Sequence, residues 1–209
     1  MPQSSTVSFC EVQDRFVFLD VATDRYFCLG RETEAAWRAV LAGTPDPGQA
    51  ALLKQRRLAV SPPCPRAIAT ASLLDQAATR SVDVLTMAAL VCSIWRTRAR
   101  LRRGGLAGGL EALRQARRRA PRRTPRGFGD LGSVARDFAR LALFVTPHNQ
   151  CLPHSLALAI HLAHRGHQPE LVFGVRLGPF RAHCWVECEG HLVNDRYERV
   201  RAYAPIHRA

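Results

Sequence analysis

Apolar and polar residues alternate in three short runs over the first thirty positions of the chain. Alternation at every second residue is typical of a strand with one buried face, whereas apolar positions three and four residues apart indicate a helix. The first part is therefore predicted to contain strands at 7–12, 16–21 and 25–29, helices at 32–41 and 49–57, and a short strand at 58–60. This order of elements is typical of a small winged-helix-like domain.

Prolines interrupt the pattern at 61–65, and helical periodicity dominates from residue 82 onward. Helices are predicted at 82–103, 106–119, 131–144 and 151–164, with a Gly104-Gly105 break between the first two. Strands are predicted at 171–175, 182–188, 191–193 and 199–203. The pattern thus predicts an α+β fold in three parts: a winged-helix-like front domain at 1–60, a linker at 61–80 and a second domain at 81–209.

The composition favours a soluble protein of a reducing compartment. Of the 209 residues, 47% are hydrophobic, which is enough for a packed core. The seven cysteines are scattered and include no C-x-x-C pair, so they do not indicate a disulfide scaffold. The N-terminus does not resemble a signal peptide, and the longest apolar run, 84–95, is shorter than the roughly 20 residues of a membrane span. We expect a cytoplasmic protein with no membrane contact.

Positive charge is concentrated in one stretch of the chain. The formal net charge is +13, and residues 96–126 contain 12 arginines and a single acid, Glu111. Such a stretch could hold an acidic partner, a nucleotide phosphate or nucleic acid, or it could be the solvated face of a helix. No aromatic residues lie between the arginines, as a single-strand binder would require. We therefore favour a solvated face or a protein partner over nucleic acid.

Three residues of the second domain have the types and the order of a cysteine-based catalytic triad. Cys151 opens a helical run, His183 lies in an alternating run, and Asp195 follows a short strand. A helix N-terminus favours the thiolate, an imidazole accepts the thiol proton, and a carboxylate orients the imidazole. Each residue alone has a plain structural explanation, but their order in matching local structure favours a triad. The backbone N–H of Cys151 and the side chain of Gln150 are candidates for oxyanion binding.

Side-chain alternation divides the residues around His183 between two faces of the predicted strand. Cys184 and Cys188 share one face, which we assign to the core. His183 and Trp185 share the other face, which we expect to point toward the helix that begins at Cys151.

This arrangement is similar to that of papain-like and transglutaminase-like enzymes. Four stretches resemble the lasso-peptide maturation B proteins: 150–158, 173–175, 182–187 and 193–195. That family consists of transglutaminase-like cysteine peptidases that remove the leader from a ribosomally made precursor. The resemblance implies a catalytic helix packed on an antiparallel sheet, with Cys151 as nucleophile, His183 as base and Asp195 as its orienting acid. At His154 the chain departs from relatives that carry arginine, which leaves the triad intact.

The segment 18–29 resembles the PqqD-like recognition element that binds such leaders. If the third predicted strand is a sheet edge, an extended leader could add to it as a further strand. Six residues are candidates for leader contacts: Tyr26, Phe27, Cys28, Leu29, Arg56 and Arg57. The alternative is that the front domain binds no leader and serves only to dock onto the second domain.

The resemblance also implies partners. These are the leader segment of a precursor peptide and an asparagine-synthetase-like lasso cyclase, which acts after leader removal. The cysteine chemistry itself requires no cofactor, and any dependence on ATP would come from the cyclase.

A metal site and two other functions compete with this interpretation. Four histidines lie close together in sequence: His154, His161, His164 and His167. They lack the H-E-x-x-H or paired-cysteine spacing of zinc sites, so we predict no metal. The first rival function is a transglutaminase-like acyltransferase, which would pass the acyl group to an amine. The second is a nucleic-acid-binding regulator, which the winged-helix-like front and the arginines would suit.

Overall fold

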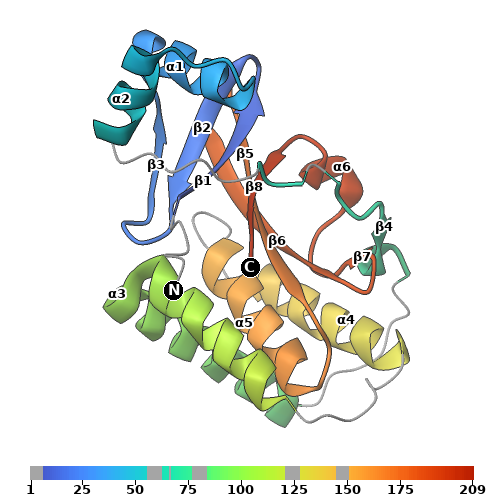
Figure 1. Ribbon diagram of the computed structural model, residues 1–209. Coiled ribbons are helices and arrows are strands. Elements are labelled where there is room, and N and C mark those ends of the chain that lie inside the picture. Colours follow the sequence, from blue (N-terminus) through green and yellow to red (C-terminus); the bar gives the residue numbers. More distant parts are fainter. Residues whose placement is uncertain (1–6, 56–62, 66, 77–83, 121–127, 145–150) are drawn as a thin grey trace.

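The computed structural model describes residues 7–55, 63–65, 67–76, 84–120, 128–144 and 151–209. It confirms the α+β class, because helices pack against two separate sheets, one of three strands and one of five (Figure 1). The predicted strand at 58–60 lies outside the described residues, as do the candidate site residues Gln150, Arg56 and Arg57.

The front part has the predicted order of strands followed by helices. Its elements are β1 (Val7–Val12), β2 (Arg15–Asp20), β3 (Arg25–Cys28), α1 (Arg31–Leu41) and α2 (Pro47–Gln55). The three strands are antiparallel in the order β1-β2-β3, so β3 forms one edge of this sheet. The predicted sheet edge is thus present among the described residues.

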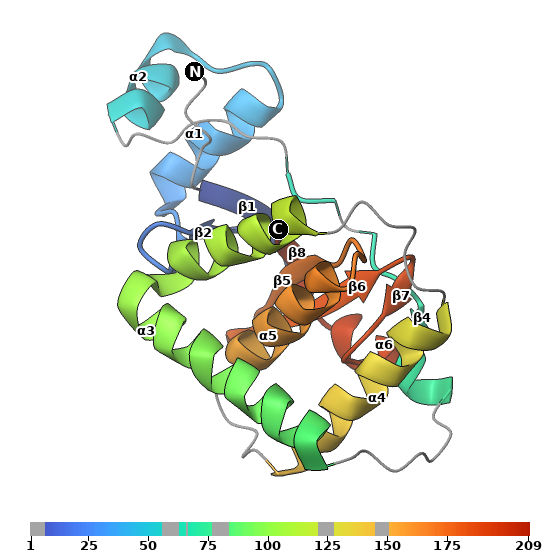
Figure 2. The same cartoon turned by 90° about the horizontal axis from the view of Figure 1, so that it is seen from below.

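The second part is a larger sheet with helices on both faces. Its elements are β4 (Ala71–Ser72), a 3-10 helix (Leu73–Gln76), α3 (Val84–Arg119), α4 (Phe128–Phe144), α5 (Cys151–His164), β5 (Glu170–Arg176), β6 (Arg181–Cys188), β7 (His191–Leu192), α6 (Tyr197–Val200) and β8 (Ala204–Arg208). The strand order is β4-β7-β6-β5-β8, antiparallel except that β4 runs parallel to β7. Helices α3, α4 and α5 gather on one side of this sheet, with α5 nearest to it (Figures 1 and 2).

Two predicted segments differ from the structure. The predicted strand at 199–203 is wrong: this segment forms the end of α6 and a turn, and the last strand is β8. The reason is that the apolar residues of this segment recur at every third position, as in a helix. Tyr197, Val200 and Tyr203 pack together against the sheet face that contains Trp185. Within the predicted linker, residues 71–72 form β4 and therefore belong to the larger sheet.

Both faces of the front sheet are buried. Phe18 and Phe27 lie opposite each other and face the α1 side, where Trp37 packs edge-on against Phe18. Because side chains alternate along a strand, Leu19 and its partner Tyr26 point to the other side. There, four residues join the hydrophobic core of the second part: Cys10, Val17, Leu19 and Val21. The front sheet therefore lies between its own helices and the rest of the molecule.

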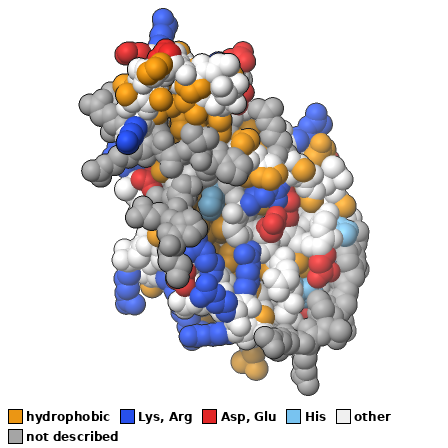
Figure 3. Space-filling view, viewed as in Figure 1, with side chains coloured by type: hydrophobic (Ala, Val, Ile, Leu, Met, Phe, Trp, Pro, Cys, Tyr) orange, Lys and Arg blue, Asp and Glu red, His pale blue; other side chains and the backbone are white. Residues whose placement is uncertain are grey.

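Helix α3 carries the glycine break and the arginines. The predicted break at Gly104-Gly105 is a kink, since Gly105 has φ 59° and ψ −163° in an otherwise helical stretch. Most arginines of α3 are exposed and gather over this helix (Figure 3): Arg96, Arg100, Arg102, Arg103, Arg114, Arg118 and Arg119. Within the described ranges, none of the helices has both the length and the apolar character needed to cross a bilayer.

Candidate active site

Cys151 is the first residue of α5, where the chain enters the core of the second part. Its side chain is half-buried and packs against the main hydrophobic cluster. At a helix N-terminus, unpaired N–H groups and the helix dipole favour a negative charge. One turn later, the buried Ser155 donates a hydrogen bond from Oγ to the backbone oxygen of Cys184, at 3.1 Å. This bond fixes the start of α5 against β6.

The structure brings the three predicted triad side chains together. His183 lies on β6, and its Nε2 is 2.5 Å from Oδ2 of Asp195, which follows β7. With Nε2 engaged by the carboxylate, Nδ1 is the ring atom left for another partner. The side chains of His183 and Cys151 lie close enough for each to shift the pKa of the other. The thiol, the imidazole and the carboxylate thus follow one another in that order, with the imidazole hydrogen-bonded to the carboxylate.

This arrangement stabilises charge on both the thiol and the imidazole. The pKa of Cys151 is lowered to about 4, chiefly by a hydrogen bond from the Cys184 thiol and further by His183, while burial opposes the shift. Burial alone would lower the pKa of His183, but the hydrogen bonds to Asp195 and Cys151 raise it to about 9. Between these two values, Cys151 is a thiolate and His183 is an imidazolium. A thiolate is the nucleophilic form of cysteine.

Cys184 takes part in the site in a way that sequence reasoning missed. It is 3% exposed, as a core assignment requires, but it faces α5 and contacts the Cys151 side chain. The pKa of the Cys184 thiol is raised well above its usual range by this contact and by burial, so Cys184 remains a proton donor to the thiolate. Our assignment of the helix-facing side to His183 was therefore wrong. The Cys184 face packs on α5, and His183 reaches Cys151 from the other face of β6.

A network of polar side chains holds the triad in place. Asn194 donates from Nδ2 to Oγ of Ser155 at 2.8 Å and accepts the N–H of Val186 at 2.8 Å. Ser72 on β4 donates from Oγ to the backbone oxygen of Asp195, also at 2.8 Å. These contacts were not predicted. The sequence signals them only by position: Ser155 lies one turn after Cys151, and Asn194 lies next to Asp195.

Aromatic rings form a wall behind His183. The ring centroids of Trp185 and Tyr203 lie 6.1 and 5.3 Å from that of His183. The prediction that Trp185 shares the His183 face is confirmed. Gly174 on β5 lies opposite His183 and makes room for this wall, because a Cβ there would be 2.8 Å from two ring carbons of Trp185 and 2.9 Å from Cβ of Tyr203.

We expect Gly174→Ala to destabilise the fold by about 1–3 kcal/mol, the usual cost of overpacking a filled core. Because the displaced rings contact His183, the variant should also slow the alkylation of Cys151 severalfold. Thermal denaturation and timed labelling with iodoacetamide measure the two effects. Gly108→Ala on α3 is the control, since its Cβ would meet nothing within 4 Å. Equal labelling rates for Gly174→Ala and the wild type would contradict this role of the aromatic wall.

The structure places the described candidates for leader binding in different surroundings. Cys28 is exposed, and Phe27 stacks on Phe18 with ring centroids 5.2 Å apart. Leu29 is 9% exposed and belongs to the core between the front sheet and α1, so its side chain is buried and not open to a leader as a contact residue would be. Tyr26 points away from α1 and toward the second part.

The four histidines do not gather around one point. His154 and His161 pack against Phe138, with ring centroids 5.5 and 5.8 Å from its ring. His164 is exposed at the end of α5. His167 is buried, and its Nδ1 is 2.9 Å from Oε1 of Glu189.

His167 also belongs to a group whose composition would suit a metal ion. Its ligand atoms and those of Cys188 and Glu189 lie within 4.8 Å of one another. However, Nδ1 of His167 is already engaged by Glu189, and Nε2 lies 3.5 Å from Oδ2 of Asp130. Asp130 lies on α4 and Glu189 lies in the β6–β7 turn, so the buried His167 ring links these two segments. The absence of a metal remains a prediction.

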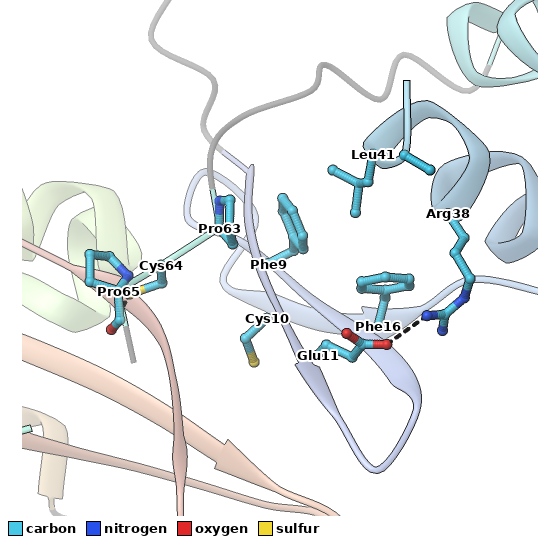
Figure 4. Close-up of a pocket in the computed structure, with 10 residues that line it drawn as sticks. Phe9, Cys10, Glu11, Phe16, Arg38, Leu41, Pro63, Cys64 and Pro65 are labelled. Carbon is cyan, nitrogen blue, oxygen red and sulfur yellow. Dashed lines mark hydrogen bonds and ion pairs between the residues drawn. The ribbon is translucent and has the colours of Figure 1, made fainter. Parts of the chain in front are cut away.

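A separate hollow of about 630 Å³ lies in the front part between β1, α1 and residues 63–65 (Figure 4). Its walls include the rings of Phe9 and Phe16 and an ion pair of 2.7 Å between Arg38 and Glu11. Neither Cys151 nor another member of the triad lines it. The hollow is therefore distinct from the site around the thiolate.

The comparisons with known proteins point to the same part of the chain. The model of the Transglutaminase-like superfamily matches residues 93–208, more than half of the chain. Over 47 residues the sequence is 45% identical to the "Microcin J25-processing protein McjB" of Escherichia coli, a match that covers 22% of this chain and only 23% of that protein. No solved structure matches the chain significantly. With Cys151, His183 and Asp195 all inside the matched range, this chain belongs to the transglutaminase-like superfamily.

Proposed function

We propose that this protein is a cysteine peptidase that removes the leader from a ribosomally synthesised lasso-peptide precursor. One observation supports the chemistry most directly: Cys151 begins a helix and lies by His183, which is hydrogen-bonded to the carboxylate of Asp195. The superfamily match supports cysteine-based acyl chemistry. The partial relative from Escherichia coli is a microcin-processing protein, which supports a peptide precursor as the substrate.

The proposed reaction proceeds in two steps. In the first, the Cys151 thiolate attacks the carbonyl carbon of the scissile amide, and the backbone N–H of Cys151 donates to the developing oxyanion. His183 then gives its proton to the leaving amine, the C–N bond breaks, and a thioester remains on Cys151. In the second step, His183 takes a proton from water. The resulting attack breaks the C–S bond, which releases the leader with a new carboxylate and restores the thiolate. Asp195 holds the imidazole in position throughout.

The front part is proposed to capture the leader. Among the described residues, strand β3 is a sheet edge, and an extended peptide could pair with the backbone groups along it as an added strand. Phe27 and Cys28 lie on this strand, and Arg56 and Arg57 follow α2 in sequence. Capture by one part and cutting by the other raises the local concentration of the cut site, so a modest catalytic centre can still select one substrate.

The further partner remains part of the proposal. An asparagine-synthetase-like cyclase would act on the freed core peptide, and ATP would enter through that enzyme, because the cysteine steps require no cofactor. The protein would work in the cytoplasm, where thiols stay reduced. The exposed arginines of α3 provide a surface for an acidic protein partner.

Acyl transfer to an amine uses the same first step, so product analysis must separate it from hydrolysis. We expect precursor incubated in oxygen-18-labelled water with an excess of a small primary amine to yield a leader with a labelled carboxylate. Mass spectrometry of the leader fragment reads the outcome. A leader that carries the amine and no labelled oxygen would instead assign the protein to the acyltransferases. The Cys151→Ala variant is the control for spontaneous cleavage.

A further inference from the structure

Tyr26 belongs to the front sheet but lies against the core that also contacts the nucleophile. It is opposite Leu19 on the sheet face that packs into the second part. Leu19 is completely buried there, whereas Tyr26 is half-buried. Cys151 borders the same hydrophobic cluster from the start of α5. A residue of the proposed recognition strand thus borders the same hydrophobic core as the proposed nucleophile.

A second aromatic ring completes this feature from the other part of the chain. Phe180 lies in the turn between β5 and β6, just before the strand that carries His183. The ring centroids of Tyr26 and Phe180 are 5.6 Å apart, at an interplanar angle of 60°. Phe180 is 48% exposed, which leaves part of the pair open to a ligand.

The phenol of Tyr26 lies close enough to the active-site thiols for their charges to affect its pKa. Its pKa is raised, first by burial and then by Cys184, Asp24, Cys151 and Cys10. The phenol therefore remains a neutral O–H donor at every pH at which the thiolate–imidazolium pair exists. An apolar ring with a single hydrogen-bond donor, close to a nucleophile, suits contact with an extended peptide.

We propose that Tyr26 and Phe180 form a substrate-positioning subsite, which holds an apolar side chain of the peptide beside the bond that Cys151 attacks. This inference rests on the proposed peptidase function and deepens it. The same strand, β3, offers its edge to the leader and its Tyr26 side chain to the cleavage site. A peptide bound along β3 is therefore held close to the thiolate.

Kinetics with two substrates test the subsite. Tyr26→Ala and Phe180→Ala should each lower kcat/KM for a short peptide that spans only the cut site by about tenfold, the factor that corresponds to 1.4 kcal/mol. The Kd of an isolated leader peptide should stay within about twofold of the wild-type value. Arg25→Ala, on the same strand but exposed, is the matched control and should leave both unchanged.

Two outcomes would overturn the subsite. Unchanged kcat/KM on the short peptide with weakened leader binding would assign Tyr26 to leader capture alone. Normal kinetics of Phe180→Ala would also reject it, and because Phe180 is half exposed, a failure of this variant to fold is no ready explanation. Tyr26→Phe separates the two parts of the tyrosine: it should keep the ring contact and lose only the contribution of the hydroxyl.

A labelling experiment distinguishes failure of the subsite from failure of the proposed function. Cys151 is labelled with iodoacetamide and, separately, with N-phenylmaleimide, whose aromatic ring would occupy the subsite. Tyr26→Ala and Phe180→Ala should slow only the second reaction, by about three- to tenfold. If the wild type cuts no precursor, but the two substitutions still slow only the reaction with N-phenylmaleimide, the peptidase proposal fails and the apolar subsite stands. If both variants react as the wild type does with both reagents, the subsite is wrong whatever the substrate.

Discussion

Replacement of Cys151 by alanine is expected to reduce precursor cleavage by about a millionfold, to the background of the assay, as loss of the nucleophile does in a comparable triad. No other group among the described residues combines a depressed thiol pKa, a helix N-terminus and an adjacent imidazole. Cys151→Ser should retain at most a trace, because an alcohol is a poor nucleophile in a site built to stabilise a thiolate. Both variants should stay folded and bind the leader with wild-type affinity.

Thiol labelling provides an independent measure of the same property. At about pH 6, a cysteine of ordinary pKa is almost entirely protonated, whereas Cys151, with a pKa of about 4, is ionised. Iodoacetamide should therefore modify Cys151 well before Cys28 and Cys92, although both of these are exposed. Cys92→Ala is the control for cleavage. Wild-type cleavage by Cys151→Ala, or equal labelling of all three cysteines, would eliminate Cys151 as the nucleophile.

Replacement of His183 by alanine should cause almost the same loss as removal of Cys151, because the site loses its general acid and base together with the positive charge that stabilises the thiolate. Asp195→Asn should be about 100-fold milder, as orienting carboxylates are in comparable triads. Steady-state kinetics on the precursor compare the three variants. A variant of Asp195 more damaging than that of His183 would reverse the assigned roles.

The pH dependence of cleavage shows in which direction each interaction shifts the pKa of its partner. Activity should rise through about pH 4 as Cys151 ionises and fall through about pH 9 as the His183 imidazolium loses its proton. Asp195 raises the pKa of His183, so Asp195→Asn should move the alkaline limit below about 9 and narrow the active range. A limit that stays in place would show that the carboxylate does not set the charge of the ring.

Local patterns predicted much of the fold and of the site. The bounds of β1 and α5 agree with the prediction because each has a clear period and a sharp end. The triad could be named because a nucleophile, a base and an acid must be of particular residue types and must lie at the ends of particular elements. The segment 199–203 was mistaken for a strand because a run of so few residues fits period two and period three almost equally well.

Contacts between distant segments could not be predicted in this way. Ser72 supports Asp195 from a strand of two residues, too short to give a periodic signal. Cys184 was assigned to the core correctly, but its hydrogen bond to Cys151 depends on which face of β6 meets α5. Tyr26 was expected to contact the leader, and its place against the core that Cys151 borders depends on how the front sheet docks. Each of these facts is a matter of tertiary packing, which alternation along one strand does not determine.

The burial of the front sheet on both faces has a consequence for the way the molecule melts. Val17, Leu19 and Val21 belong to the same hydrophobic cluster as Leu156 and Phe173, so neither part completes its core without the other. Separated halves would each expose an apolar surface and tend to aggregate. A single cut by a protease at the proline segment 63–65 should leave the halves associated, with one cooperative unfolding transition. Recognition and catalysis would then be lost together on heating, instead of one persisting after the other.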